Sequence, residues 1–333
     1  STIGLFYPFC AAFFIMTCGL SFLETSANPY ILSMGDQATA TRRLNLAQSF
    51  NPMGSIIGIL VAKDFILAKI NSAGTEERAA MTAEAFEQIK MADLAIVRGP
   101  YVAIGIVIIA MFLLIWMTRM PKTQDGGKSL DLAGTFSRLM ANLKYRQGVV
   151  AQAFYVGAQI TVWTYTIYYG TEVLMGEGMS ESAAAAEAVN YNFYAMVLFA
   201  LSRFICTFLL KYIDSGRLLM FLSIGAMILL IPVIGVGGRF GLYALVGISG
   251  CMSLMFPTIY GIALEGLTDD AKLGAAGLVM AIAGGSLLPP IQGLLIDQIG
   301  VKLSYVIPLV CFVVIALYGL RMYRLRQTES LYS

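Results

Sequence analysis

The sequence has 333 residues, of which 58% are hydrophobic and only 13% are charged, and its mean hydropathy is +0.75. A soluble domain carries roughly twice that share of charged residues, so the composition excludes a soluble globular protein. It indicates an integral membrane protein whose first partner is the lipid bilayer. The formal net charge is +2 without a basic tract, so no nucleic-acid partner is expected.

Cysteine and histidine usage limits the chemistry. The five cysteines all lie in apolar segments without CxxC spacing, which predicts neither a disulfide framework nor a zinc site. The sequence contains no histidine, so any proton transfer has to use carboxylates. We therefore expect no metal and no cofactor, with H⁺ as the only coupling ion.

Apolar segments follow one another along the chain, and several reach the ~20 residues that cross a bilayer core. They cover residues 5–32, 42–66, 99–118, 147–170, 188–211, 217–236, 240–263, 273–296 and 303–322. The predicted fold class is all-α integral membrane, with these nine segments as transmembrane helices.

Basic residues alternate between loops. Of the 22 Lys and Arg, 14 lie at the loops after the first, third, fifth and seventh segments and in the C-terminal tail. Because Lys and Arg concentrate in cytoplasmic loops, the C-terminus is predicted to be cytoplasmic. With nine helices the N-terminus would then lie outside. We expect a multi-pass protein of a bacterial inner membrane, acting as a monomer.

A weak internal repeat relates Gly19–Leu32 to Gly247–Tyr260, with Pro29 aligned on Pro257. The helices that follow, 42–66 and 273–296, keep nearly the same offset. Parallel repeats of this kind build the two halves of major facilitators. Three helices precede the seventh within its half, so three should precede the first. We expect nine of twelve helices, with the first three missing.

The expected domains follow from this repeat. Residues 1–118 form the last three helices of the N-terminal half, 119–146 a cytoplasmic linker, and 147–333 the six-helix C-terminal half. The apolar spacing between Leu130 and Leu143 in the linker predicts a short amphipathic helix on the membrane surface.

Glu24 is a carboxylate within the first apolar segment. A charge at the bilayer centre costs about 2.5–3.5 kcal/mol or more, so Glu24 has to face protein or water. Thr25, Ser26 and Asn28 surround it, and Pro29 loosens the helix beside it by removing a backbone donor. A carboxylate that is alternately shielded and hydrated is what a proton-coupled carrier requires. A structural hydrogen bond that never titrates is the alternative.

Asn45, Gln48 and Asn51 are spaced by three residues, which predicts one polar helical face. Amides offer paired donors and acceptors, which suit the hydroxyls of a sugar. Hydrogen bonding between helices, at about 0.6 kcal/mol per bond, is the other interpretation. Three amides in register favour a substrate cavity.

A second polar stripe opens the later half of the chain. Gln152, Tyr155, Gln159 and Trp163 are spaced 3, 4 and 4 and predict an aromatic and amide wall for a sugar. Interfacial Tyr and Trp are the competing interpretation, and we favour it for Tyr165, Tyr168 and Tyr169.

Charged residues also predict a gate. Arg203 lies within an apolar segment, and Lys211, Asp214 and Arg217 follow it at the cytoplasmic side. We interpret Arg203, Asp214 and Arg217 as a charge relay that gates transport. Pro289 and Pro290, shortly after Gly284 and Gly285, predict a bent or broken helix.

The run from Glu24 to Ser55, ETSANPYILSMG followed by ATRRLNLAQSFNPMGS, resembles the L-fucose–proton symporter family of the major facilitator superfamily. AQAFYVGAQITVWTY and MSLMFPTIYG resemble it too. The resemblance implies uptake of L-fucose with a proton by alternating access. It implies that Glu24 is one of two proton-handling carboxylates, the other lying upstream, and that Gln48 and Asn51 contact sugar. Phe256 stands where the family has Tyr, and Asn28 joins the expected sugar set.

Other functions stay open at this point. A glucose/galactose transporter of the same family shares the ETxxNPY pattern, and another major facilitator carrier, such as a drug exporter, would share the fold. A membrane enzyme would need a catalytic dyad at the interface, and none is found, so we expect a protein that is not an enzyme. A sensor that binds sugar without moving it is the remaining alternative.

Overall fold

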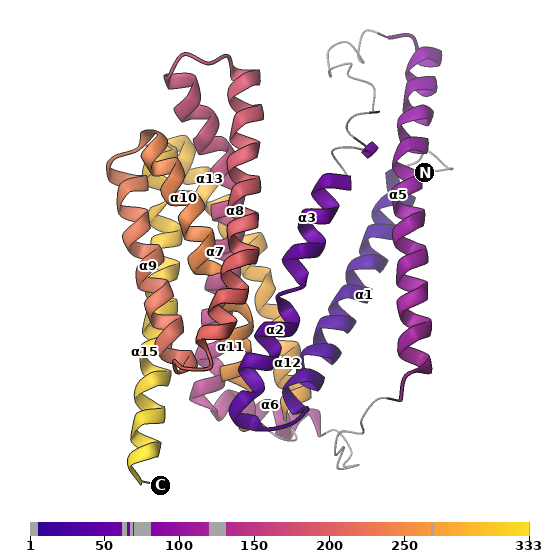
Figure 1. The fold of residues 1–333 in the computed structure, drawn as a ribbon. Helices are drawn as coiled ribbons and strands as arrows, with labels where there is room; N and C mark the ends of the chain where they lie inside the picture. Colours follow the sequence, from indigo (N-terminus) through magenta and orange to yellow (C-terminus); the bar gives the residue numbers. More distant parts are fainter. Residues whose placement is uncertain are drawn as a thin grey trace. The chain divides into compact units, whose positions relative to one another are not determined.

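The structure, a computed structural model, describes residues 6–61, 65–66, 69, 81–119, 131–267 and 270–332 (Figure 1). All regular secondary structure in these residues is helical. The first part contains α1 (Phe6–Ser33), η1 (Gln37–Thr39), α2 (Ala40–Gln48), α3 (Asn51–Val61) and α5 (Ala83–Met117). Then come α6 (Leu132–Ala141), α7 (Leu143–Gly176), α8 (Glu181–Leu209), α9 (Ser215–Gly235), α10 (Gly238–Met252) and α11 (Met255–Leu264). The last elements are α12 (Ala271–Met280), η3 (Ala281–Ala283), α13 (Gly284–Ile299), α14 (Val301–Ser304) and α15 (Val306–Tyr332).

The chain forms two compact units. Unit 1 comprises Ser1–Leu23 and Gly54–Asp125, and unit 2 comprises Glu24–Met53 and Gly126–Ser333. Unit 2 thus combines the end of α1, all of α2 and the start of α3 with α6 to α15. The division into halves at residues 118 and 147, predicted from the repeat, is a different partition and stays a prediction.

Seven helical stretches in the described residues are long and apolar enough to cross a membrane. They are Tyr7–Ser33, Ala83–Met117, Glu181–Leu209, Ser215–Gly235, Gly238–Leu264, Ala271–Ile299 and Val301–Thr328. The two other predicted segments differ for physical reasons. Segment 42–66 is split into the short helices α2 and α3, and α7, although 34 residues long, carries the polar stripe from Gln152 to Trp163.

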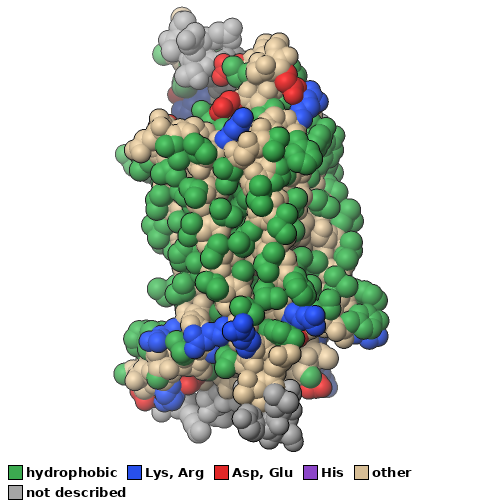
Figure 2. Space-filling view, turned by 90° about the vertical axis from the view of Figure 1, so that its left-hand side faces the viewer, with side chains coloured by type: hydrophobic (Ala, Val, Ile, Leu, Met, Phe, Trp, Pro, Cys, Tyr) green, Lys and Arg blue, Asp and Glu red, His purple; other side chains and the backbone are tan. Residues whose placement is uncertain are grey.

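The kind of exposed side chain on unit 2 changes along the direction of the helices. Figure 2 shows the face on the side of α9 and α15, where apolar side chains cover the middle and Lys and Arg gather along one edge. Exposed Arg217, Arg321 and Arg324 belong to this end, where α9 begins and α15 finishes. We call it the basic end. An apolar band bounded by charge is the surface expected of a protein whose middle lies in lipid.

α7 packs at the centre of unit 2, against α8, α10, α11, α13 and α15. Its Tyr155 and Tyr169 are fully buried, as are Tyr305 and Phe312 beside them. Tyr169 and Tyr305 meet edge to face, with ring centroids 5.8 Å apart. The core thus lies around α7, and the polar side chains of α7 are enclosed by its neighbours.

Three helical stretches of the described chain are interrupted near their middle. The stretch 40–61 breaks at Ser49–Phe50, 238–264 breaks at Ser253–Leu254, and 271–299 passes through the 3-10 turn η3. Pro52 and Pro257 follow the first two breaks by a few residues, because a proline supplies no N–H to the helix before it. The helix with Pro289 and Pro290 is interrupted, as predicted, but the interruption is at η3, before Gly284, and α13 continues through both prolines.

A helix in the linker, as predicted, is confirmed as α6, and its place on the membrane surface stays a prediction. Its Leu139 is buried, whereas Leu132 and Phe136 are exposed. Asp131 caps the helix by accepting a hydrogen bond from the Gly134 N–H at 3.0 Å. Residues 120–130 of the linker lie outside the described residues.

Candidate functional site

A chain of hydrogen bonds runs from the carboxylate of Glu24 on α1 to the next helix. Asn28 Nδ2, one turn along α1, donates to Glu24 Oε2 at 2.6 Å. Gln48 Nε2, at the end of α2, donates to Asn28 Oδ1 at 2.9 Å. Glu24 and Gln48 are half-buried and Asn28 is buried. The two bonds fix the direction of both amides, so the orientation of Gln48 depends on what Glu24 accepts.

The three amides predicted on one face of residues 42–66 have different surroundings. Asn45 is fully buried, and its Nδ2 donates to Thr258 Oγ1 on α11 at 3.2 Å and to the Thr41 carbonyl at 2.8 Å. Gln48 points to α1, and Asn51 is exposed at the start of α3. The break at Ser49–Phe50 separates Asn51 from the other two. Of the three, Gln48 and Asn51 keep side-chain surface open to a substrate.

Two prolines leave two backbone carbonyls without a helical partner. In a helix the carbonyl of residue i accepts from the N–H of residue i+4, and proline has none. Pro52 therefore leaves the Gln48 carbonyl free, and Pro257 leaves the Ser253 carbonyl free. Both lie in the interior of the protein, where an unpaired carbonyl is costly.

Arg203 of α8 bonds both of these carbonyls. Its Nε donates to the Ser253 carbonyl at 2.5 Å, and its Nη1 donates to the Gln48 carbonyl at 2.9 Å. The side chain is 4% exposed, and its guanidinium lies 4.6 Å from the centroid of the Phe199 ring. Arg203 thus ties the break between α2 and α3 to the break between α10 and α11.

Trp163 joins this cluster through aromatic contacts. Its ring meets Phe199 edge to face at 5.1 Å, and its Nε1 donates to Ser249 Oγ at 3.2 Å. Asn192 Nδ2 donates to the Trp163 carbonyl at 2.7 Å. Trp163 remains partly exposed, so it can present an aromatic edge while its indole N–H is held.

The other members of the α7 stripe differ in accessibility. Gln152 and Tyr155 are fully buried, whereas Gln159 is partly exposed. Tyr155 donates to the Met252 carbonyl at 3.1 Å and its ring lies 6.3 Å from that of Phe256. The Gln152 amide has no hydrogen-bond partner among the described residues. In this conformation Gln159 and Trp163 keep some exposed side-chain surface, whereas Gln152 and Tyr155 have none.

The predicted charge relay is arranged differently from the sequence interpretation. Asp214 accepts from the Arg217 N–H at 3.0 Å as the cap of α9, while the Arg217 guanidinium lies over the rings of Phe221 and Tyr323. The ion pair of Asp214 is with Arg326, at 2.6 Å. Among the described contacts, none links Arg203 to Asp214.

Glu265 completes the ion cluster at the basic end. It pairs with Arg326 at 2.7 Å and with Lys144 at 2.8 Å. Burial by itself would raise the pKa of Glu265, but hydrogen bonds and charges from Arg326 and Lys144 outweigh it and hold the pKa below its ordinary value. The carboxylate therefore stays ionised and links α7, α11 and α15.

Several residues were not singled out from the sequence. Thr258 and Ser253 of the α10–α11 region, and Phe199 and Asn192 of α8, all contact the predicted site residues. Gly261 of α11 was not singled out either; it lets α11 approach α2 closely, because a Cβ there would lie 2.7 Å from Thr41 Oγ1. The sequence did contain a signal for the Arg203 contacts. Pro52 and Pro257 each leave a carbonyl four residues earlier without a helical donor, and Arg203 lies inside an apolar span.

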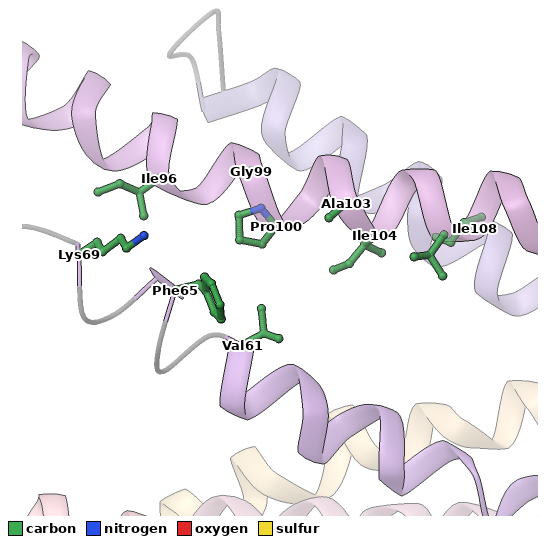
Figure 3. A pocket seen from close by; sticks show the side chains of 10 residues that line it. Val61, Phe65, Lys69, Ile96, Gly99, Pro100, Ala103, Ile104 and Ile108 are labelled. Atoms are coloured by element: carbon green, nitrogen blue, oxygen red, sulfur yellow. The ribbon is translucent and has the colours of Figure 1, made fainter.

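Unit 1 contains a groove of a different kind. It lies between the end of α3 and α5, has a volume of about 680 Å³, and is lined by Val61, Phe65, Lys69, Ile96, Gly99, Pro100, Ala103, Ile104, Val107 and Ile108 (Figure 3). Lys69 carries the one polar side chain of this lining. Such a surface offers almost no partner for sugar hydroxyls, so the polar residues of unit 2 are the better candidate site.

Comparisons with known proteins identify the family of the chain. No family model matches the sequence. The chain is 46% identical to the L-fucose-proton symporter of Haemophilus influenzae, over 96% of this chain and 76% of that protein. The chain belongs to the fucose permease family of the major facilitator superfamily.

A solved structure and a second relative are also similar to the chain. The crystal structure of the fucose:proton symporter FucP of E. coli superimposes with a TM-score of 0.86 at 32% identity, covering 93% of this chain and 75% of that one. A glucose/galactose transporter of Brucella abortus is 31% identical over 94% of this chain and 71% of that protein. The fold of this fucose permease family member is therefore that of a multi-pass membrane transporter.

Proposed function

We propose that the protein takes up L-fucose together with a proton across the bacterial inner membrane, by alternating access. The relay from Glu24 through Asn28 to Gln48 carries this proposal, because it links a titratable group to an amide that can bind a sugar hydroxyl. The name of the Haemophilus influenzae relative, at 46% identity, supports the choice of substrate and coupling ion. Glucose or galactose is the alternative substrate, supported by the more distant Brucella abortus relative.

The ionisation of Glu24 sets the availability of Gln48. The ionised Glu24 Oε2 can only accept, so it holds the Asn28 NH₂ group and turns Asn28 Oδ1 towards Gln48. When Oε2 binds a proton it becomes a donor, and the Asn28 amide has to turn to present its oxygen. The Gln48 NH₂ group then loses its acceptor and is free for a sugar hydroxyl. Protonation therefore precedes tight sugar binding.

The proposed sugar contacts come from α1, from the pair α2–α3 and from α7. Gln48, Asn51 and Asn28 supply amides, and Gln159 and Trp163 supply a wall with an aromatic edge. Asn45, Gln152 and Tyr155 are enclosed here, so they contact sugar only after the helices around them move. Phe256 presents a ring where the family has a phenol, so one hydroxyl contact is lost.

Arg203 acts as the gating residue. It bonds carbonyls of the α2–α3 break and of the α10–α11 break, so the two segments separate only if Arg203 releases one of them. Asp214 and Arg217 act in the gate at the basic end through Arg326 and the aromatic contacts of Arg217. A neutral sugar fits this site, because Arg203 already donates to two carbonyls and so offers less to a negatively charged substrate.

The proposed topology places the basic end, and with it the C-terminus, in the cytoplasm. α7 and the pair α2–α3 cross the membrane in addition to the seven apolar stretches, which gives nine spans of a twelve-helix fold. Residues 1–118 contribute to the first half, 119–146 link the halves and 147–333 form the second. The protein works as a monomer without a cofactor and is not an enzyme.

Glu24→Gln in the intact protein tests the coupling. Reconstituted into vesicles, the variant should lose accumulation of labelled L-fucose driven by a proton gradient, because it cannot release a proton. It should keep exchange of labelled for unlabelled fucose. Galactose and glucose as competitors separate the alternative substrates. A variant that still concentrates fucose like the wild type would falsify the role of Glu24.

Asn28→Leu tests the relay with the carboxylate intact. In the wild type the affinity for fucose should rise as the pH falls and Glu24 becomes protonated. In Asn28→Leu this pH dependence should flatten, since Gln48 no longer senses Glu24. An unchanged pH dependence in this variant means that the proton acts on the sugar site by another route.

A further inference from the structure

A polar pocket opens at the basic end of unit 2. It has a volume of about 240 Å³ and is lined by Gln37, Ala38, Thr41, Arg42, Leu210, Lys211, Tyr212, Ile213, Asp214, Ser215 and Arg326. Three separate parts of the chain meet there: the start of α2 with the turn before it, the turn between α8 and α9, and the last turns of α15. The pocket shares Asp214 and Arg326 with the proposed gate, whereas Arg42 and Lys211 have no part in the proposed transport cycle.

The charges around the pocket do not cancel. Arg326 is matched by two carboxylates, since it bonds Asp214 Oδ2 at 2.6 Å and Glu265 Oε1 at 2.7 Å, and it also donates to Ser215 Oγ at 3.0 Å. Arg42 and Lys211 are exposed, and no ion pair is recorded for either in the described residues. Two cationic side chains therefore border one polar cavity.

Neutral groups around the cavity complete a site for an oxyanion. Thr41 and Tyr212 bring hydroxyls and Gln37 brings an amide, all able to donate a hydrogen bond. α2 begins beside the pocket as a continuation of η1, whose start is capped by Asp36, which accepts from the Ala38 N–H at 3.1 Å; the cations and the neutral donors therefore carry the recognition. Arg and Lys beside hydroxyls are the groups that recognise phosphate.

Other basic pockets at this end have more apolar linings. A pocket with Arg146 and Arg321 also contains Gln147 and Tyr318, but its other lining residues are Leu143, Val150, Val314 and Leu317, and a pocket with Arg321 and Arg324 is lined mainly by leucines. Basic residues by themselves mark the cytoplasmic ends of membrane helices. What distinguishes the pocket at Arg42 is that its two cations without a recorded ion pair face a lining that is mostly polar.

We propose that this pocket binds the phosphate group of an anionic ligand, and that the bound phosphate ties the start of α2 to the α8–α9 turn. Arg42 supplies a positive charge from the start of α2, and Lys211 supplies one from the α8–α9 turn. The phosphate belongs either to a lipid headgroup or to a free phosphate compound, and both share the same recognition chemistry. Binding at this place needs neither fucose nor a proton gradient.

The test measures the thermal unfolding midpoint of the intact purified protein with two probes. The first is inorganic phosphate against chloride at equal ionic strength. The second is a phosphatidylcholine nanodisc with and without phosphatidylglycerol. At least one probe should raise the midpoint in a saturable manner. Stabilisation by phosphate identifies a free phosphate group as sufficient, and stabilisation by phosphatidylglycerol alone identifies a lipid.

Arg42→Gln and Lys211→Gln should each weaken the apparent affinity about tenfold, because each removes a charge-assisted hydrogen bond. Arg324→Gln, an exposed basic residue of the same end outside the pocket, is the matched control and should bind like the wild type. The proposal is overturned if neither probe stabilises the wild type. It is equally overturned if Arg324→Gln loses as much affinity as the pocket variants, or if either pocket variant binds unchanged.

Discussion

Replacing Arg203 gives the sharpest test of how the helix breaks are held together. Arg203→Met keeps much of the side-chain volume but removes both hydrogen bonds to the Gln48 and Ser253 carbonyls, and the stacking on Phe199. Hydrogen bonds from a charged donor contribute about 1.5–3 kcal/mol each. The cation–π contact adds roughly 0.5–2 kcal/mol. The variant should unfold at a clearly lower temperature and lose fucose exchange.

Arg203→Lys gives an intermediate expectation. A lysine keeps the charge but carries a single nitrogen, so it reaches one of the two carbonyls. It should lose about one charged hydrogen bond, or 1.5–3 kcal/mol, which is a change of about 10- to 150-fold in the equilibrium that holds the breaks together. Thermal unfolding in detergent and exchange of labelled fucose in vesicles measure the two consequences. Arg239→Met is the control, because Arg239 is exposed and paired with Glu177 at the far end.

A double-mutant cycle with Pro52→Ala examines the cause directly. Alanine at position 52 restores an N–H four residues after Gln48, so the Gln48 carbonyl no longer depends on Arg203. Arg203→Lys should therefore cost less in the Pro52→Ala background than in the wild type. An equal cost in both backgrounds would refute the idea that Arg203 serves the carbonyls left free by proline.

Two further changes act at the basic end and at the contact of α2 with α11. The bonds to Arg326 and Lys144 hold the pKa of Glu265 below its ordinary value, so they stabilise the fold fully at pH values above the pKa of an unfolded Glu, about 4.3. This stabilisation is lost as the pH falls through the lower pKa of the folded state. Glu265→Gln, which leaves Arg326 without this charge, should therefore remove the acid-dependent step from thermal unfolding curves. Gly261→Ala should lower the free energy of unfolding by about 1–3 kcal/mol, because the added methyl group overpacks against Thr41. Part of this loss should be recovered in a Thr41→Ala background. Gly105→Ala is the control and should show no loss, because nothing lies within 4 Å of its Cβ position.

The sequence predicted the class of protein and most of its helices because both depend on local chemistry. A chain in lipid has to satisfy its own backbone hydrogen bonds, so long apolar runs become helices whatever packs beside them. The helices α8, α9 and α15 follow from this rule, whereas the amphipathic helix α6 was predicted from the spacing of its apolar residues. Glu24 and Arg203 stood out for the same reason, as charges that lipid does not accept.

Only the tertiary structure decided which of these polar groups meet. Asn45, Gln48 and Asn51 shared a face in the sequence pattern, but the break at Ser49–Phe50 gives them different partners. Arg203 was expected beside Asp214, yet it bonds two carbonyls that lie 155 and 50 residues away along the chain. Periodicity fixes the face on which a side chain lies, whereas its partner depends on how distant helices pack.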